Sequence, residues 1–546
     1  MATLSIRQGN CVHTVHFTAP APLWEVLRDA GVSIARPCGG RGVCGKCAVL
    51  LSGAASETSD AERAALAGRR SDADTGDAEM RLACQTYLTG DAEVILPDRG
   101  ETARIELSFA SETPQASGIP DNGGSLPRLD GCADAGNAFC EADGDEKRRF
   151  GAAIDIGTTT LALALYDLSS GKCLAKRGLL NPQCAEAADV MGRIQAALTG
   201  KGATLQNEVT GALGSMLGEA LREAGCAAPG RQDLPGPEDV DPAAAAEKTV
   251  IVGNTTMLYL LCGKDPVSLS HAPFEADDLF DRTEDILGIP SYLPACMNAF
   301  VGADITAAVL HSGMCRKEET SLLCDIGTNG EIALWHKGTL FVTSTAAGPA
   351  FEGAGISCGM GSEEGAVDRV WEEDGEIRLH TIGNAPARGI CGSGLLDAVA
   401  VLLGLERIDE TGAAEEEDLV LGEGVCLLPK DIRAVQLAKG AIRAGIETVM
   451  KKAGVTVKDV TSLYIAGGFG SHLDPASASA IGLIPPPLAG RVVILGNAAL
   501  AGASEMLLDG EAVSFSKEIA AKAVHVDLGG NPLFNELFVE HMLFEE

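Results

Sequence analysis

The chain is short of basic residues, and this shortage excludes two classes of partner. Its 546 residues include 42 lysines and arginines against 76 aspartates and glutamates, which gives a formal charge of -34. A charge of this sign repels nucleic-acid phosphates and anionic lipid surfaces. We therefore expect no nucleic acid and no membrane among its partners.

Long hydrophobic runs are also missing. No apolar stretch reaches the roughly 18 to 20 residues that span a bilayer, and the first 30 residues lack the basic-then-apolar pattern of a signal peptide. Closely spaced cysteines are scarce too, because among 17 cysteines only Cys44 and Cys47 have the C-x-x-C spacing. Disulfide frameworks belong mainly to small secreted domains. These patterns predict a cytoplasmic protein with scattered core thiols.

The length predicts several domains, since one hydrophobic core rarely serves more than about 250 to 300 residues. Alternating apolar residues around a Gly9-Asn10 turn predict a β-hairpin, and apolar residues at helical spacing from Leu23 to Ala30 predict a helix. Val94 to Leu96 would form a last short strand. Residues 99–149 have the Gly, Pro, Ser and Asp content of a flexible linker, and residues 224–247 resemble a second flexible insertion.

Four cysteines near the N-terminus have the spacing of an iron-sulfur site. Cys38, Cys44, Cys47 and Cys84 follow the pattern C-x5-C-x2-C-x36-C. A [2Fe-2S] cluster needs four converging thiolates, usually three from a tight loop and one from a distant strand. Glycines within this loop allow backbone N–H groups to approach the cluster sulfurs. Residues 1–98 thus resemble the adrenodoxin-type branch of the plant-type ferredoxins, which have a β-grasp fold.

Two other interpretations of the cysteines fit this spacing less well. Zinc sites usually combine two short knuckles, whereas this segment has one C-x-x-C pair and a long glycine-rich loop. A second cluster would need another closely spaced set, which the remaining thirteen cysteines do not provide. We predict one [2Fe-2S] cluster and one-electron transfer.

A repeated tetrapeptide predicts a phosphate-binding site. The sequence D-I-G-T occurs at residues 155–158 and again at 325–328, each time between two apolar runs. A hairpin of this kind can bind a nucleotide, because its carboxylate orients hydrated Mg²⁺ while turn N–H groups and hydroxyls meet phosphate oxygens. One copy alone would equally suit an ordinary hairpin turn. A third segment, residues 463–470, runs from an apolar strand into a glycine turn that could approach an adenine or ribose.

Together these segments resemble the superfamily of acetate and sugar kinases, Hsp70 and actin. The resemblance spans residues 150–546 and implies an α/β fold in which two ribonuclease-H-like halves close on Mg-ATP. It assigns Asp155 and Asp325 to catalysis. The implied nucleotide-binding residues are Gly157, Thr158, Thr159, Thr160, Gly327, Thr328, Asn329, Gly467, Gly468 and Gly470.

Three further segments are ambiguous. Asp304 lies in a Gly-x-Asp context before a helical run, where the superfamily places a catalytic base, although an ordinary helix N-cap is equally compatible. Residues 392–394, Gly-Ser-Gly, could approach the nucleotide or allow close helix packing. Residues 252–256 favour a helix cap.

A ferredoxin ahead of such an ATPase resembles the reductive activators of corrinoid-dependent proteins. Further segments similar to that family lie at residues 181–183, 189–190, 253–257, 300–304, 348–353 and 466–470. The resemblance implies ATP-dependent reduction of Co(II) to Co(I) on a partner corrinoid protein, an external low-potential electron donor, and compatibility with a homodimer. One departure is that longer relatives carry a small middle domain before the ATPase, where this chain has only the linker-like residues 99–149.

Two alternative functions remain at this point. One is a small-molecule kinase or ATP-dependent amidohydrolase of the same fold with a regulatory ferredoxin. The other is a non-enzymatic module in which nucleotide switches a redox-sensing binder. ATP turnover stimulated by a metabolite would favour the first, and negligible turnover with every partner the second.

Overall fold

The computed structural model describes most of the chain. The described residues are 1–8, 11–30, 32, 34, 40, 42, 47–66, 78–96, 148–225, 245–422, 424–468 and 472–544. Most of the predicted linker at 99–149 and most of the predicted insertion at 224–247 lie outside these ranges. Strand β10 begins at Ala246, just inside the insertion's expected end.

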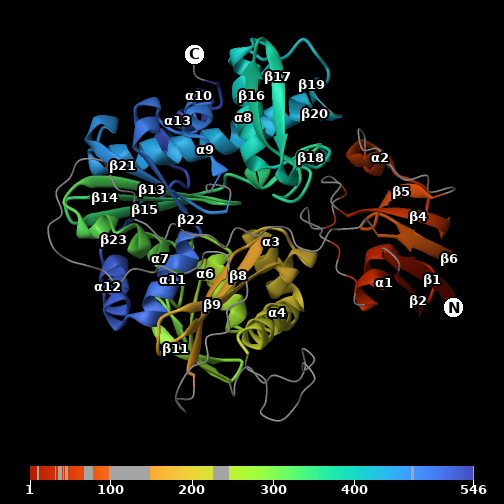
Figure 1. The fold of residues 1–546 in the computed structure, drawn as a ribbon, viewed down its shortest axis with the longest axis horizontal. Helices are drawn as coiled ribbons and strands as arrows, with labels where there is room; N and C mark the ends of the chain where they lie inside the picture. The colour runs from red at the N-terminus through yellow and green to blue at the C-terminus, as the bar shows by residue number, and fades with distance from the viewer. Residues whose placement is uncertain are drawn as a thin grey trace.

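The N-terminal unit is a mixed sheet with a helix packed against it (Figure 1). The predicted hairpin is confirmed, since the first two strands pair antiparallel, and so is the predicted helix, α1. The last strand is longer than expected, because β6 starts at Tyr87 and occupies the middle of the sheet, parallel to β1 and antiparallel to β4. The elements are β1 (Ala2–Gln8), β2 (Cys11–Phe17), β3 (Ala21–Pro22), α1 (Leu23–Asp29), β4 (Ala48–Ala55), α2 (Asp60–Leu66), β5 (Glu79–Leu82) and β6 (Tyr87–Ile95).

The next unit is built on a six-stranded sheet of order β11-β12-β10-β7-β8-β9. Its central strands are continuous apolar runs, as expected where helices cover both faces of a sheet. The strands are β7 (Phe150–Ile156), β8 (Thr160–Asp167), β9 (Cys173–Leu180), β10 (Ala246–Gly253), β11 (Arg282–Ile286) and β12 (Ile289–Leu293). The helices are α3 (Val190–Ala196), α4 (Gly202–Glu223), α6 (Thr255–Leu261) and α7 (Ala303–Ser312).

The last unit has a second six-stranded sheet of order β22-β21-β13-β14-β15-β23. Its strands are β13 (Thr320–Ile326), β14 (Gly330–His336), β15 (Thr339–Thr345), β21 (Val460–Ala466), β22 (Val492–Gly496) and β23 (Ala523–His525). Two small sheets are added to it: β16 (Ala366–Glu373), β17 (Glu376–Thr381) and β18 (Gly389–Ile390); β19 (Leu419–Gly422) and β20 (Val425–Leu427). The helices are α8 (Gly392–Gly404), α9 (Pro429–Ala453), α10 (Pro475–Ala480), α11 (Ala498–Leu508), α12 (Gly510–Ala521) and α13 (Pro532–Glu540).

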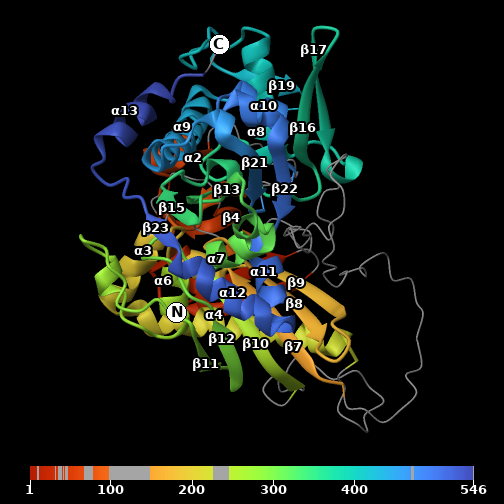
Figure 2. The ribbon, with the colours of Figure 1, turned by 90° about the vertical axis from the view of Figure 1, so that its left-hand side faces the viewer.

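The two large sheets repeat one topology. In the first, β7, β8 and β9 form an antiparallel meander, and β10 adds parallel to β7. In the second, β13, β14 and β15 form the same meander, and β21 adds parallel to β13. The duplication predicted from the repeated tetrapeptide is therefore confirmed, and the two halves lie one above the other in both ribbon views (Figures 1 and 2).

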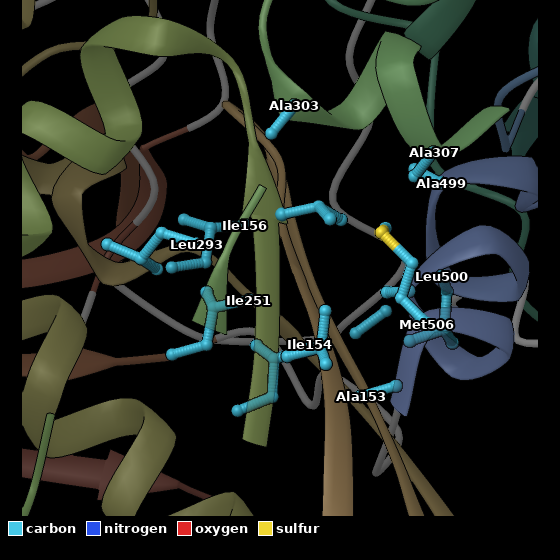
Figure 3. Close-up of a cluster of buried hydrophobic side chains, with 14 of the residues drawn as sticks. Ala153, Ile154, Ile156, Ile251, Leu293, Ala303, Ala307, Ala499, Leu500 and Met506 are labelled. Atoms are coloured by element: carbon cyan, nitrogen blue, oxygen red, sulfur yellow. The ribbon is translucent and has the colours of Figure 1, made fainter. Parts of the chain in front are cut away.

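The hydrophobic core of the first half includes a helix from the C-terminal part of the chain. Figure 3 shows Ala499, Leu500 and Met506 of α11 beside Ala303 and Ala307 of α7, with Ile154 of β7 nearby. The two helices cross closely, because a Cβ on Gly502 would lie 2.1 Å from the Ala307 carbonyl oxygen. Within the described ranges, no helix has the length and apolar character needed to cross a bilayer.

Candidate functional site

The two D-I-G-T segments form the turns of two equivalent hairpins. The Gly157 amide donates to the Thr160 carbonyl at 2.9 Å, and the Gly327 amide donates to the Asn329 carbonyl at 3.0 Å. A side chain at residue 157 would not fit, since its Cβ would lie 2.7 Å from the Thr160 oxygen. The turns thus close tightly, as the sequence predicted.

The turns of the two halves meet through their threonines. The Oγ1 atoms of Thr159 and Thr328 are 3.3 Å apart. A third side chain joins them, because Oε2 of Glu352 accepts hydrogen bonds from Thr159 at 2.7 Å and from Thr328 at 3.0 Å. Residues 348–353 were noted only as a family-like segment, so the place of Glu352 between the turns was not predicted.

Thr158 points away from the other half. Its hydroxyl accepts a hydrogen bond of 3.1 Å from Nδ2 of Asn254, and its side chain is buried. Asn254 also caps helix α6, since its Oδ1 accepts from the Met257 amide at 2.9 Å. The helix cap predicted for residues 252–256 is confirmed, and Asn254 also supports the turn at residues 155–158.

Five carboxyl groups lie near the meeting point of the halves: Asp155, Asp304, Asp325 and Glu352, which are half-buried, and Glu331, which is buried. Burial, followed by the nearby charge of Asp304, raises the pKa of Asp155 to about 8 and the pKa of Asp325 to about 7. Burial raises the pKa of Asp304 to about 6. Burial also raises the pKa of Glu331 and of Glu352, and for Glu352 the two threonine hydroxyls oppose it. Like charges this close together oppose one another's ionisation.

Asp155 and Asp325 each lie against a residue from the C-terminal part of the chain. Nδ2 of Asn497, at the start of α11, donates to Oδ2 of Asp155 at 3.1 Å. Gly467 has φ of 93°, and a Cβ there would lie 2.6 Å from Oδ1 of Asp325. The glycine predicted to admit a nucleotide therefore makes room for a carboxylate of the site. Gly468 is exposed, while the predicted Gly470 lies outside the described residues.

Asp304 does not cap its helix. Helix α7 begins at Ala303 with Gly302 as its N-cap, so Asp304 lies inside the first turn. The N-cap interpretation was wrong because the chain reaches the helix through Gly302, which packs so closely that a Cβ would lie 2.4 Å from Cα of Asn254. Asp304 is half-buried, and its charge is one of the causes that raise the pKa of Asp155 and Asp325, which places it near both.

The Gly-Ser-Gly segment at 392–394 serves packing. A Cβ on Gly394 would lie 2.2 Å from the Val367 carbonyl oxygen, and the Ser393 hydroxyl donates to the Asp368 carbonyl at 3.0 Å. Helix α8 thus packs directly on strand β16, which favours the second of the two interpretations of this segment.

A buried arginine lies behind the turn at residues 155–158. Arg193 of α3 has no solvent exposure, and its guanidinium donates to the carbonyls of Thr158 and Ala187 and to Oε1 of Gln183. It also contacts the sulfur of Met257 at 3.0 Å. Burial lowers the pKa of Arg193. Sequence reasoning missed this residue, although its neighbours at 181–183 and 189–190 had been noted.

The described part of the predicted cluster site brings two cysteines close together. Cys47 is buried, and its carbonyl accepts a 2.9 Å hydrogen bond from the amide of Ala83, the residue before Cys84. The Gln85 amide nitrogen donates to the Gly40 carbonyl at 2.6 Å and lies 3.7 Å from Sγ of Cys84. Gly40 is thereby tied to the residue that follows Cys84, while Cys38 and Cys44 lie outside the described residues. These residues fit a [2Fe-2S] cluster.

Comparison with known proteins identifies three matched regions. Residues 10–89 match the 2Fe-2S iron-sulfur cluster binding domain. Residues 150–317 match the family described as the RACo middle region, and residues 319–546 match the C-terminal domain of RACo, the ASKHA domain. The region described as "middle" is therefore the first half of the duplicated fold. The small domain that longer relatives carry ahead of the ATPase would fall at residues 99–149, most of which lie outside the described residues.

The chain is 33% identical to the corrinoid activation enzyme RamQ of Eubacterium limosum over 443 residues, which cover 74% of this chain and 72% of that protein. It belongs to the family of corrinoid activation enzymes. A second member, the [Co(II) methylated amine-specific corrinoid protein] reductase of Methanosarcina barkeri, is 30% identical over 271 residues, 45% of this chain and 50% of that protein. The solved structure of a reductive activator for corrinoid, iron-sulfur protein is 27% identical, with a TM-score of 0.66, and the match covers 100% of this chain and 98% of that one. The family thus combines a [2Fe-2S] ferredoxin with an ASKHA-type ATPase in one chain.

Proposed function

We propose that this corrinoid activation enzyme uses ATP to return an inactive Co(II) corrinoid on a partner protein to Co(I), with the electron supplied through its [2Fe-2S] cluster. One observation carries the proposal: two equivalent phosphate hairpins, one from each half, meet at Thr159 and Thr328 in a chain that also matches a ferredoxin. An ATPase alone or a ferredoxin alone would fit many functions.

The nucleotide's phosphates would bind to the two turns. Their N–H groups and the hydroxyls of Thr159 and Thr328 are donors on opposite sides of the meeting point. Asp155 and Asp325 would orient the waters of a Mg²⁺ ion shared with the phosphates. Asp304, with its pKa raised to about 6, is suited to accept a proton from an attacking water.

Cys38, Cys44, Cys47 and Cys84 would hold the cluster, which supplies one-electron chemistry when bound. Gln85 would position Gly40 near Cys84 through its hydrogen bond to the Gly40 carbonyl. We assign residues 1–98 to the ferredoxin, 99–149 to a linker and 150–546 to the ATPase. We also propose an external low-potential electron donor and, by resemblance, a homodimer.

The need for ATP follows from the energetics of the electron transfer. Co(I) corrinoids are strong reductants, so an electron from a ferredoxin cluster moves uphill. Each ~59 mV of a one-electron couple corresponds to about 1.4 kcal/mol. A difference of a few kcal/mol between binding of the Co(II) and Co(I) states therefore shifts the couple by on the order of 100 mV. ATP hydrolysis would then drive release of the product complex.

The test is a coupled reduction followed by absorption spectroscopy. Reduced protein, Mg-ATP and a Co(II) corrinoid protein should give the absorption spectrum of Co(I), and ATP hydrolysis should rise when the Co(II) partner is present. Omission of ATP, or the substitution Cys47→Ser, should prevent Co(I) formation. Equal Co(I) formation without ATP, from a donor of physiological strength, would contradict the proposal and favour the kinase with a regulatory ferredoxin.

A further inference from the structure

The carboxylate of Glu352 occupies a position that has the character of an anion site. Its Oε2 accepts from the hydroxyls of Thr159 and Thr328, and the Thr328 backbone amide adds a further hydrogen bond. Its Oε1 lies near Gly327, since a Cβ on that glycine would be 3.4 Å away. Turn amides, threonine hydroxyls and a glycine without a side chain are the groups that bind phosphate oxygens in nucleotide sites.

The hydroxyls of Thr159 and Thr328 are wanted both by Glu352 and by the phosphates of a bound nucleotide. A threonine hydroxyl carries one proton and can donate to one acceptor at a time. In the described conformation both protons are directed at Glu352. A phosphate oxygen that binds between the same turns must take those protons from the carboxylate. It must also overcome repulsion by the negative charge of Glu352, which solvent screens only in part because the side chain is half-buried.

We propose that Glu352 competes with the nucleotide's phosphates for the two threonine hydroxyls and thereby sets the affinity for nucleotide. This inference rests on the proposed nucleotide site. Thr159 belongs to the first half, whereas Thr328 and Glu352 belong to the second, so the bond from Thr159 to Glu352 also joins the halves. Phosphate binding that releases this bond changes a contact between the halves, which links nucleotide binding to their relative movement.

The test compares three full-length variants in Mg-ADP binding by calorimetry. Glu352→Gln keeps the shape of the side chain but removes its charge, and we expect about tenfold tighter binding because a half-buried like charge next to the phosphates is lost. Thr159→Val removes a donor that the phosphates need, so it should weaken binding. Glu364→Gln, an exposed carboxylate in the same half, is the matched control and should leave the affinity unchanged.

Hydrogen exchange without nucleotide provides a second measurement. Amides at residues 157–160 and 327–330 should exchange faster in both Glu352→Ala and Thr159→Val, since each change removes one partner of the bond between the halves, whereas the Oε1 atom of a glutamine can still accept it. Glu352→Ala should also bind Mg-ADP more tightly. Opposite effects of these two variants on affinity together with equal effects on exchange support the proposal, because a general loss of structure would weaken binding in both.

Other outcomes overturn it in distinguishable ways. If the unaltered protein binds Mg-ADP and Glu352→Gln binds it no more tightly, the competition is refuted while the nucleotide site stands. Tighter binding by Thr159→Val would refute it as well. If the unaltered protein binds neither Mg-ADP nor Mg-ATP, the proposed nucleotide site fails and this inference fails with it.

Discussion

Asn497 and Asp155, 342 residues apart, are joined by a 3.1 Å hydrogen bond from Nδ2 to Oδ2. Asn497 caps helix α11 through its Oδ1, which accepts from the Leu500 amide at 2.8 Å. One amide side chain therefore fixes both the start of a helix and the direction of a carboxylate at the end of β7. The partly buried carboxylate keeps its orientation even though its pKa is raised to about 8.

We expect Asp155→Ala and Asp325→Ala each to abolish Mg²⁺-dependent ATP hydrolysis. Loss of a metal-orienting carboxylate removes several kcal/mol of transition-state stabilisation. The exposed Asp418 provides the control, and Asp418→Ala should hydrolyse ATP at the normal rate. Steady-state phosphate release measures the effect; less than about tenfold loss in both site variants would rule out the assignment, provided that the cluster spectrum is unchanged.

The half-buried carboxyl groups predict that stability falls as pH rises. Asp304, Asp325 and Asp155 have folded-state pKa values raised to about 6, 7 and 8, so the folded chain holds protons that the unfolded chain has released. The free energy of unfolding should therefore decrease between about pH 5 and 8, by up to roughly 1.4 kcal/mol per pH unit for each proton involved. Urea unfolding without Mg²⁺ or nucleotide measures this slope.

The substitution Asp155→Asn tests the origin of that slope. An amide of the same shape has no charge to lose, so the variant should show a smaller decrease in stability between pH 6 and pH 8 than the unaltered protein. Identical slopes in the two proteins would show that other groups govern the pH dependence.

Arg193→Lys should destabilise the first half. A lysine has one nitrogen and cannot serve the carbonyls of Thr158 and Ala187 and Oε1 of Gln183 together. Buried acceptors left without donors cost about 1–3 kcal/mol each. Arg378→Lys, which changes an exposed arginine paired with Glu376, should cost less than about 1 kcal/mol. Urea midpoints compare the two variants, and equal midpoints would contradict the role given to Arg193.

Cys38→Ser and Cys84→Ser should each lose the [2Fe-2S] signature in absorption and in paramagnetic resonance of the reduced protein. A serine oxygen does not replace the soft thiolate without changing the site. Cys426→Ser alters a half-buried thiol of the last unit and should keep the native spectrum. An intact spectrum in both ligand variants would exclude these two cysteines as ligands.

The sequence predicted the features that a short contiguous pattern encodes. The hairpins at 155–158 and 325–328 could be predicted because an apolar run, the D-I-G-T segment and a second apolar run follow one another along the chain. The roles of Gln85, Arg193 and Asn497 could not, because each depends on a partner brought close by folding. The contact between Gly467 and Asp325, on the neighbouring strand, could not be predicted for the same reason, while a role of Gly467 in nucleotide binding stays a prediction.

The close crossing of α7 and α11 determines which fragments of the chain can fold when they are expressed separately. The matched regions separate between residues 317 and 319, yet α11 and α12 fill the core of the first half from beyond that point. A fragment of residues 150–317 would leave the apolar faces of α7, β7 and β10 uncovered, and such faces promote aggregation. Recombinant dissection of the two halves should therefore fail at the family boundary and succeed only if residues 498–521 are supplied, either fused to the fragment or co-expressed as a complementing peptide.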